Sequence, residues 1–432
     1  MKPTPTIHAM LSLLLICAMT VSLTGCGAGA KNPDFYLKKV QAADLMDSVK
    51  AGEVSGKAAD DTFFRAQMKL TVDLFKSSVQ ESKNENVLIS PLSIQLALAM
   101  TANGADGETR KEMEALLGDG LSIEELNKYL YTHINSLPSE DKYKLGIANS
   151  IWFRDDENRL TVEQDFLQTN ADYYDAQIYK SAFDDQTVKD INHWVAGHTN
   201  GMIDEILDQI DPDTVMYLIN ALVFDAKWEK TYELSDIWDG TFTAVSGDTR
   251  KVKMMNSTEG KYLDDGKATG FIKDYKDGKY SFAALLPNEN VDIYDYIDGL
   301  TNEGLLQTIK NAGAGSVMAI MPKFSYEYEL TMNDLLKKLG MPSAFNSGIA
   351  DFSKLGHSSY GNIYIGNVLH KTFIAVDELG TKAGAVTSVE MKNESAMLTD
   401  REVRLDRPFV YMIIENGTGL PIFIGTVMDI EK

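Results

Sequence analysis

The order of helical and extended patterns along the 432 residues constrains the fold of this chain more than any other feature. Apolar residues recur at helical spacing over Phe63–Val79 and again over Val188–Thr199. Between them, Pro91 is expected to begin an apolar helix over Leu92–Ala102, with Ser90 as its N-cap. Towards the carboxyl end β-rich runs predominate. The predicted strands are Leu145–Phe153, Met216–Trp228, Phe271–Lys273, Tyr280–Leu286, Val317–Pro322, Asn362–Val368, Phe373–Val376, Val410–Glu415 and Pro421–Val427. Early helices followed by many strands indicate a mixed α+β domain with large sheets.

The amino-terminal residues have the pattern of an export signal. Lys2 gives a weak positive start, and Ala9–Leu23 is almost entirely apolar, with the length of a signal peptide and too short to span a membrane comfortably. The run ends in Leu23-Thr24-Gly25-Cys26, which resembles the lipobox of bacterial lipoproteins. That resemblance implies a signal peptide over residues 1–25 and a lipidated thiol at Cys26, and so a location on the extracellular side of a bacterial membrane. The alternative is an ordinary secretory signal with an incidental cysteine and a secreted product.

The rest of the chain contains no cysteine, because Cys17 and Cys26 are the only two. We expect residues 26–61 to be the lipidated cysteine and a tether, with a short helix around Leu37–Val49. The globular domain is then residues 62–432, and it folds without disulfides although it lies outside the cytoplasm. A formal net charge of -22 opposes binding to nucleic acid or anionic lipid, so contact with a membrane is expected only through the anchor.

Motifs for catalysis, metal binding and nucleotide binding are missing from the sequence. There is no His-Glu-x-x-His, no cysteine and histidine spacing typical of zinc, no Gly-x-Ser-x-Gly and no P-loop. Gly313-Ala314-Gly315 lacks a third glycine and is interpreted as a turn. His193 and His198 are five positions apart, which does not place two ligands on one helical face. We therefore expect no enzyme activity, no metal and no cofactor.

Near the carboxyl end, residues Val403–Ile413 resemble the signature of the serpin family at every constrained position. Upstream, Glu378–Thr387 resembles the hinge of inhibitory serpins. The resemblance runs from about Phe63 to the end, and it also includes Asn86–Met100, Ile191–Ile203, Asn220–Trp228 and Leu369–Lys371. It implies a monomer with the serpin fold, which has three β-sheets, about nine helices and an exposed reactive-centre loop at about residues 380–403.

The family mechanism implies that a protease cuts this loop and forms an acyl-enzyme, after which the loop inserts into the main sheet as a new strand. The residues implied as the hinge are Glu378, Gly380, Thr381, Ala383, Gly384, Ala385 and Thr387. Small side chains suit a strand that must enter a packed interior. Strand alternation puts Thr381, Ala383, Ala385 and Thr387 on one small, uncharged face, with Lys382 on the other. Leu379 and Val386 depart from the usual family pattern, and we expect slower insertion at worst.

Two further groups of residues are implied by the same resemblance. The shutter, which controls opening of the main sheet, is Ser90, Ser93, Asn220 and His370. The breach, where the loop first enters, is Trp228, Lys323 and Glu378. The family expectation is an ion pair between Lys323 and Glu378, although such a pair could equally be a weak surface contact.

The reactive bond follows from the family spacing of fourteen positions after the hinge glycine, which from Gly380 gives Glu394–Ser395. Met391, Lys392 and Met397 are alternative cleavage positions. These positions predict an extracellular serine protease that accepts glutamate or is elastase-like, with cysteine proteases left open. The hypothesis is a suicide inhibitor. The alternative is a non-inhibitory serpin that acts as a surface binding protein, which tends to carry bulky or charged residues or proline in its hinge. An unrelated surface hydrolase lacks a catalytic constellation.

Overall fold

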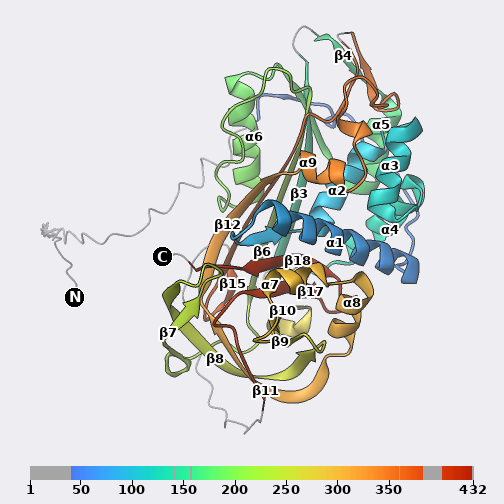
Figure 1. The fold of residues 1–432 in the computed structure, drawn as a ribbon. Coiled ribbons are helices and arrows are strands. Elements are labelled where there is room, and N and C mark those ends of the chain that lie inside the picture. The colour runs from blue at the N-terminus through green and yellow to red at the C-terminus, as the bar shows by residue number, and fades with distance from the viewer. Residues whose placement is uncertain (1–39, 140–142, 156–157, 360, 383–400, 431–432) are drawn as a thin grey trace, which may run out of the picture.

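The structure is a computed structural model that describes residues 40–430 except 140–142, 156–157, 360 and 383–400 (Figure 1). Within these residues the strands form three sheets, as expected for an α+β serpin fold. The helices are α1 (Asp61–Glu81), α2 (Pro91–Ala102), α3 (Gly107–Gly118), α4 (Ile123–Ser136), α5 (Gln164–Tyr174), α6 (Asp185–His198), α7 (Ile293–Asp298), α8 (Asn302–Lys310) and α9 (Asn333–Lys338).

The main sheet has seven strands and forms the long axis of the molecule in Figure 1. Its strands, in spatial order, are β1 (Ala43–Asp44), β5 (Gln177–Ser181), β3 (Tyr143–Arg154), β6 (Met216–Lys227), β15 (Gly380–Lys382), β14 (Asn367–Val376) and β12 (Phe324–Thr331). The strands β6 and β14 also pair directly with one another, and this pair is parallel. Two predicted strands, Asn362–Val368 and Phe373–Val376, are thus one, and the prediction began the first of them five residues too early.

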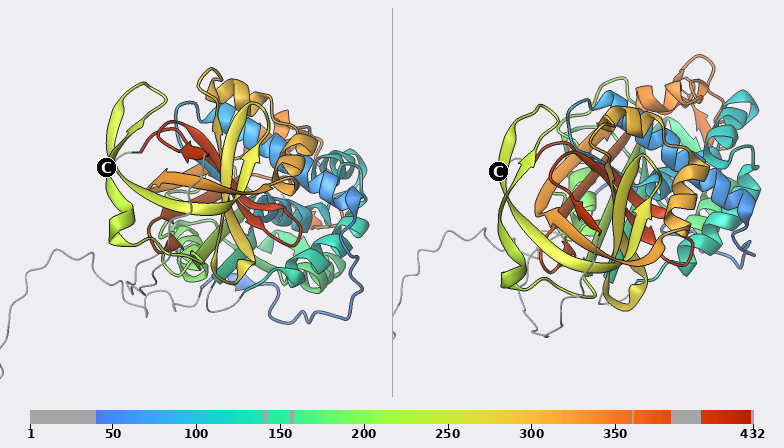
Figure 2. Two further views of the ribbon diagram at one scale, coloured as in Figure 1. Left: turned by 90° about the horizontal axis from the view of Figure 1, so that it is seen from below. Right: turned by 60° about the horizontal axis from the view of Figure 1, so that its bottom comes forward.

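The second sheet has nine strands and closes the other end of the molecule (Figure 2). The sixteen-residue β8 (Thr249–Asp264) curves so that its first half pairs with β7 (Ile237–Thr243) and its end with β9 (Ala268–Asp274). The remaining strands are β16 (Glu402–Arg404), β11 (Gly313–Pro322), β10 (Tyr280–Pro287), β17 (Phe409–Glu415), β18 (Pro421–Val427) and β2 (Val87–Ile89). A third sheet pairs β4 (Leu160–Val162) with β13 (Gly356–Ser358).

Helix α2 lies in the core beneath the main sheet. Its N-cap is Ser90, whose side chain accepts a hydrogen bond from the amide of Ser93 at 3.3 Å, and Pro91 occupies the first turn. Every residue from Pro91 to Ala102 is buried. A helix that is apolar all round is stable only when it is enclosed. This burial positions the N-cap of α2 directly against the strands β6 and β14.

The segment before α1 lies along the body. β1 pairs with β5, and the carboxylate of Asp190 accepts hydrogen bonds from the amides of Gln41 and Ala42 at 2.9 and 2.7 Å. The predicted helix around Leu37–Val49 was wrong for its described part, which is the two-residue strand β1 followed by a turn, because the sheet edge and Asp190 bind its backbone. No helix in the described residues has the length and apolar character to cross a membrane.

Candidate functional site

The start of the predicted loop forms a strand between β6 and β14. Gly380 and Thr381 pair with Lys227 and Ala226 of β6, and Thr381 also pairs with Val376 of β14. Residue 380 must be glycine here, because a Cβ atom would lie 2.1 Å from the carbonyl oxygen of Ala226. The hinge is therefore partly inserted. The hinge residues Ala383, Gly384, Ala385 and Thr387 lie outside the described residues, as does the predicted reactive bond between Glu394 and Ser395.

A tight turn leads into this strand from β14. One carboxylate oxygen of Asp377 accepts hydrogen bonds from the amides of Leu379 and Gly380 at 2.7 and 3.1 Å. The amide of Asp377 donates in return to the carbonyl of Gly380 at 3.0 Å. Leu379, noted above as a departure from the family pattern, is buried. An apolar residue is therefore compatible with this position.

Thr381 is 2% exposed, and its hydroxyl lies 2.5 Å from the hydroxyl of Tyr275. The ring of Tyr275 stacks on the indole of Trp228, with centroids 4.5 Å apart and an interplanar angle of 9°. The indole N–H of Trp228 donates to the carbonyl of Asp377 at 2.8 Å. Trp228, one of the three residues predicted for the breach, thus supports the turn. Tyr275 was missed, because nothing in its local sequence relates it to a residue more than a hundred positions away.

The predicted ion pair between Lys323 and Glu378 is present, with both side chains about one-third exposed. Partial exposure screens the pair, so its contribution to stability is at most about 1 kcal/mol. A second ion pair was missed by sequence reasoning. The ammonium group of Lys273 is buried, 2.8 Å from a carboxylate oxygen of Glu259 and 4.5 Å from the ring centroid of Tyr232. The carboxylate and the ring offset the cost of burying this charge.

The four predicted shutter residues come together where β6 and β14 pair directly. A ring nitrogen of His370, Nδ1, is 2.6 Å from the side-chain oxygen of Asn220, which is its register partner across the parallel pair. The amide of Ser90 donates to Nε2 of His370 at 3.4 Å, and the side chain of Asn220 donates to the hydroxyl of Ser93. Asn149 of β3, which was not predicted, accepts a second bond from Asn220 at 2.5 Å.

His370 is neutral in this arrangement. Burial lowers the pKa of His370 to about 3. Because Nε2 accepts a hydrogen bond from Ser90, the single ring proton is on Nδ1, which donates to Asn220. The shutter therefore joins three strands and α2 by hydrogen bonds between uncharged groups.

Beyond the shutter, towards β15, the strands β6 and β14 no longer pair with one another. The direct pairing of β6 with β14 ends at Leu222 and Thr372, and the pairing of β6 with β15 begins at Ala226. Only residues 223–225 of β6 lie between these two points. The sheet is therefore closed at the shutter and already contains the first residues of a new strand at the breach.

The sequence model of the serpin (serine protease inhibitor) family matches residues 65–430, which is most of the chain. The chain is a serpin. It is 30% identical over 381 residues to leukocyte elastase inhibitor A of Mus musculus, covering 84% of this chain and 98% of that protein. The crystal structure of the thermophilic serpin tengpin in its native state is 54% identical with a TM-score of 0.87, covering 90% of this chain and all of the other. The latent state of tengpin is 53% identical with a TM-score of 0.78, covering 87% and all of the respective chains.

Family membership and relatives such as the elastase inhibitor support protease inhibition as the general function of this serpin, with serine proteases as the general class of target. The more similar fold is that of the native state of tengpin. In agreement, the described part of the hinge enters the main sheet only at β15.

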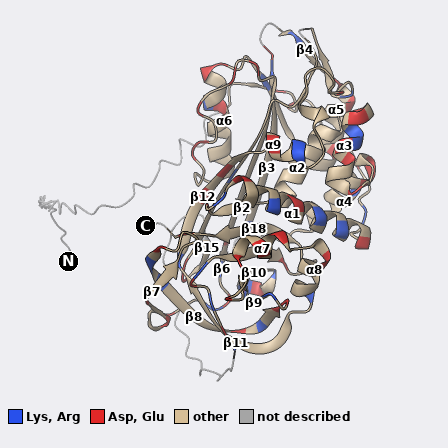
Figure 3. Ribbon diagram, viewed as in Figure 1, with Lys and Arg blue, Asp and Glu red and all other residues tan. Residues whose placement is uncertain are grey.

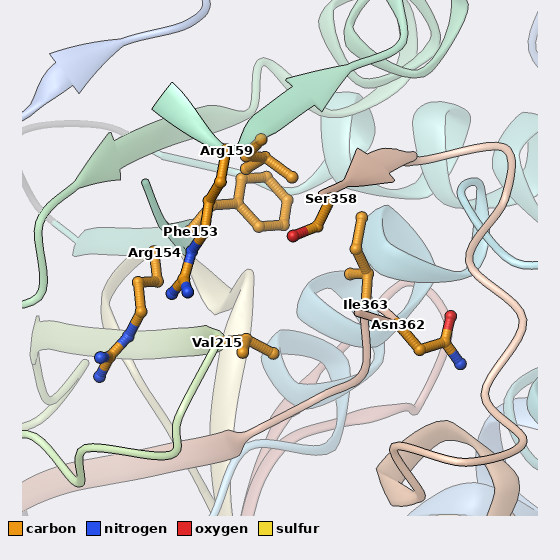
Figure 4. A pocket seen from close by; sticks show the side chains of 8 residues that line it. Phe153, Arg154, Arg159, Val215, Ser358, Asn362 and Ile363 are labelled. Carbon is orange, nitrogen blue, oxygen red and sulfur yellow. The ribbon is translucent and has the colours of Figure 1, made fainter. Parts of the chain in front are cut away.

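Two hollows lie in the described part of the serpin. A cavity of about 20 Å³ lies between the end of β3 and the segment that follows β13, and Figure 4 shows Phe153, Val215 and Ile363 around it. That volume holds about one water molecule. A groove of about 960 Å³ follows the outer edge of β12 and is rich in acidic side chains. Among the described residues no three histidine, aspartate or glutamate side chains gather as a metal site.

Proposed function

We propose that this serpin is a suicide inhibitor of an extracellular serine protease. The observation that carries the proposal is the placement of Gly380 and Thr381 between β6 and β14. A loop whose first residues already pair with both neighbours has a defined register for the residues that follow. Residues 223–225 of β6 lie between the hinge and the shutter. An inserting loop would next pair with these residues.

The chemistry begins as an ordinary proteolytic cleavage. The serine Oγ of the protease attacks the carbonyl carbon of Glu394, and the bond to the nitrogen of Ser395 breaks. The new amine of Ser395 leaves with a proton from the general acid of the protease, and an ester joins Glu394 to the enzyme. Insertion of the cut loop then removes the ester from the reach of water before it is hydrolysed. Met391, Lys392 and Met397 remain alternative cleavage positions, and an enzyme that accepts glutamate or is elastase-like is the proposed target.

Insertion has a favourable balance of backbone hydrogen bonds. Six register pairs between β6 and β14 are parallel, and a strand placed between them replaces these with antiparallel pairs on both sides. Antiparallel pairs are slightly more stable per residue. An inserted strand of about 14 residues is about 45 Å long, and its ladder bonds at about 1 kcal/mol each contribute on the order of 10 kcal/mol. The intact form is then metastable.

We further propose that Cys26 carries a lipid anchor that holds the serpin, as a monomer, on the extracellular side of a bacterial membrane. The support is the apolar run Ala9–Leu23 that ends in Leu23-Thr24-Gly25-Cys26. A cysteine-free body suits this location, because no thiol is left to form an unwanted disulfide.

The test is incubation of the serpin with a panel of serine proteases, followed by denaturing gels and mass spectrometry. The expected result is a complex that survives SDS and a released peptide that begins at Ser395. A released peptide that begins elsewhere corrects the reactive bond but leaves the mechanism. Cleavage by every enzyme without a covalent complex contradicts inhibition and favours a non-inhibitory binding role.

A further inference from the structure

Three consecutive carbonyl groups of the turn that leads into β15 are bound by one short segment. The indole and the amide of Trp228 donate to the carbonyls of Asp377 and Leu379, at 2.8 and 2.9 Å. The amide of Tyr232 donates to the carbonyl of Glu378, between them, at 3.0 Å. We call residues 228–232 the clamp. Because the hinge leaves this turn, the position of the clamp determines where a new strand begins.

A buried ammonium group lies against both aromatic rings of the clamp. Among the side chains that the structure describes, Lys273 is the only buried lysine or arginine, with 2% of its surface exposed. Charged residues elsewhere are spread over the helices, for example α1, α3 and α4 (Figure 3). Nζ of Lys273 is 4.5 Å from the ring centroid of Tyr232 and 5.5 Å from that of Trp228. A cation at these distances is attracted to the face of an aromatic ring.

Two residues of β8 complete the surroundings of this ammonium group. A carboxylate oxygen of Glu259 lies 2.8 Å from Nζ of Lys273. The hydroxyl of Ser257 lies 3.4 Å from Nζ and donates to the same carboxylate oxygen at 2.6 Å. It also lies 3.3 Å from the hydroxyl of Tyr232. The rings that belong to the clamp therefore contact a charged cluster whose other members come from β8 and β9.

Stability of the fold does not account for this pair. Removal of two charges from water costs free energy, and apolar side chains of similar volume often stabilise a protein as well or better. Alternation along β9 puts Lys273 on the same face as Phe271, which is buried and apolar. An apolar side chain would thus suit position 273. The charge adds direction, because an ammonium group attracts the faces of both rings, whereas an apolar chain would hold them by shape alone.

We propose that Lys273 and Glu259 are positioning residues for insertion of the reactive loop. This inference rests on the proposed inhibitory function. The pair holds Trp228 and Tyr232 so that their three N–H donors stay directed at the turn when the loop is cut. Insertion then starts from a fixed hinge and is completed before water hydrolyses the ester.

The test replaces both charges in the full-length serpin with apolar side chains of similar size, by Lys273→Met together with Glu259→Leu. This double variant leaves no unpaired charge in the core. The matched control is Lys261→Met, because Lys261 pairs with Asp274 at 2.9 Å across the same two strands but is exposed. Lys273→Arg is the conservative variant, since it keeps the positive charge.

Three quantities are measured for each variant. Denaturing gels give the ratio of covalent complex to cleaved free serpin, with the protease from the panel that forms the complex fastest. Hydrogen exchange followed by mass spectrometry gives the exchange rate of the amides in the clamp, without any protease. Urea unfolding midpoints give the stability of the fold. The first two quantities report on positioning, and the third separates it from a general loss of structure.

We expect the ratio of complex to cleaved serpin to fall about fivefold in the double variant, at a urea midpoint equal to or above that of wild type. A fivefold change corresponds to about 1 kcal/mol, which is the net contribution of one hydrogen bond. The amides of Trp228 and Tyr232 should exchange faster by about the same factor, because their bonds to the turn open more often. Lys261→Met and Lys273→Arg are expected to behave like wild type.

A ratio or an exchange rate equal to that of wild type in the double variant overturns the positioning role but leaves the inhibitory function. A urea midpoint that falls together with the ratio assigns the pair to the stability of the fold and also contradicts the inference. So does an equal loss in folded Lys273→Arg, which shows that shape and not charge holds the clamp. An equal loss in Lys261→Met shows that any change between β8 and β9 has this effect. If no protease forms a complex with wild type, the inhibitory function itself is wrong, and the role of the pair in trapping is overturned with it.

Discussion

Replacement of Thr381 by arginine tests whether the loop inserts between β6 and β14. Thr381 is 2% exposed, and its hydroxyl has a hydrogen-bonding partner in Tyr275. Arginine at this position would place a positive charge and five N–H donors in a space that now holds one hydroxyl. Removal of an unpaired charge from water costs several kcal/mol. Loss of the bond to Tyr275 adds about 1 kcal/mol.

The stabilisation that opposes this cost is small, because Gly380–Lys382 is held by only four register pairs to its neighbours. At about 1 kcal/mol for each backbone bond, these contribute no more than about 4 kcal/mol. We therefore expect Thr381→Arg to expel the hinge and to raise the barrier to insertion by about 3 kcal/mol or more. This barrier slows insertion roughly 100-fold, while cleavage of the exposed loop continues.

The assay is the division of protease-treated serpin between covalent complex and cleaved free protein, measured by densitometry of denaturing gels. Thr381→Arg is expected to be cut at the wild-type bond and to yield almost no complex. Thr381→Ser, which keeps the hydroxyl, is the matched control and should resemble wild type. Thr381→Val leaves the Tyr275 hydroxyl without its partner and should give an intermediate yield. Undiminished complex formation by Thr381→Arg would refute insertion at this position.

Three further predictions concern the stability of the fold, its dependence on pH and the location of the protein in the cell. Asn220→Ala leaves several buried polar partners unsatisfied, so we expect the free energy of unfolding to fall by about 2–4 kcal/mol, measured by urea unfolding. Burial lowers the pKa of His370 to about 3 and of His133 to about 4, so below pH 6.5 the unfolded chain binds more protons. Stability should therefore be complete above that pH and fall by about 2 kcal/mol per histidine between pH 7 and pH 5; a urea midpoint that is constant over this range would contradict the burial of both rings. Cys26→Ser is expected to abolish incorporation of an alkyne-labelled fatty acid in bacterial cells and to release the protein into the medium.

The sequence was sufficient for residues whose position follows from a motif. The three-sheet fold followed from the match over Val403–Ile413, and the shutter residues from short segments around Ser90, Asn220 and His370. Their partners could not be predicted in the same way, because pairing of distant strands supplies them. Asn149 reaches the shutter only because β3 pairs with β6 at that register, and that register is determined by packing of both strands on α2.

Buried polar groups were missed for a related reason. The lysine in Phe271–Lys273 ends an apolar run, which is also the pattern of an exposed charge at the end of a strand. Its burial depends on Glu259, which lies fourteen positions away on another strand. The same limit applies to the predicted helix around Leu37–Val49, where a sheet edge and the carboxylate of Asp190 compete successfully with local helix propensity.

The close fit of Gly380 against β6 has a consequence for which loop residues affect insertion and which affect the choice of protease. Because Gly380 pairs with Lys227 at close range, a loop that inserts in this register would have each later position assigned to the interior or to solvent by whether its number is odd or even. A deletion of one residue just after Lys382 would reverse that assignment and turn Val386 inward in place of Ala385. Substitutions at Glu394 would leave it intact. The choice of target protease can therefore change in evolution, one residue at a time, while the trap stays the same.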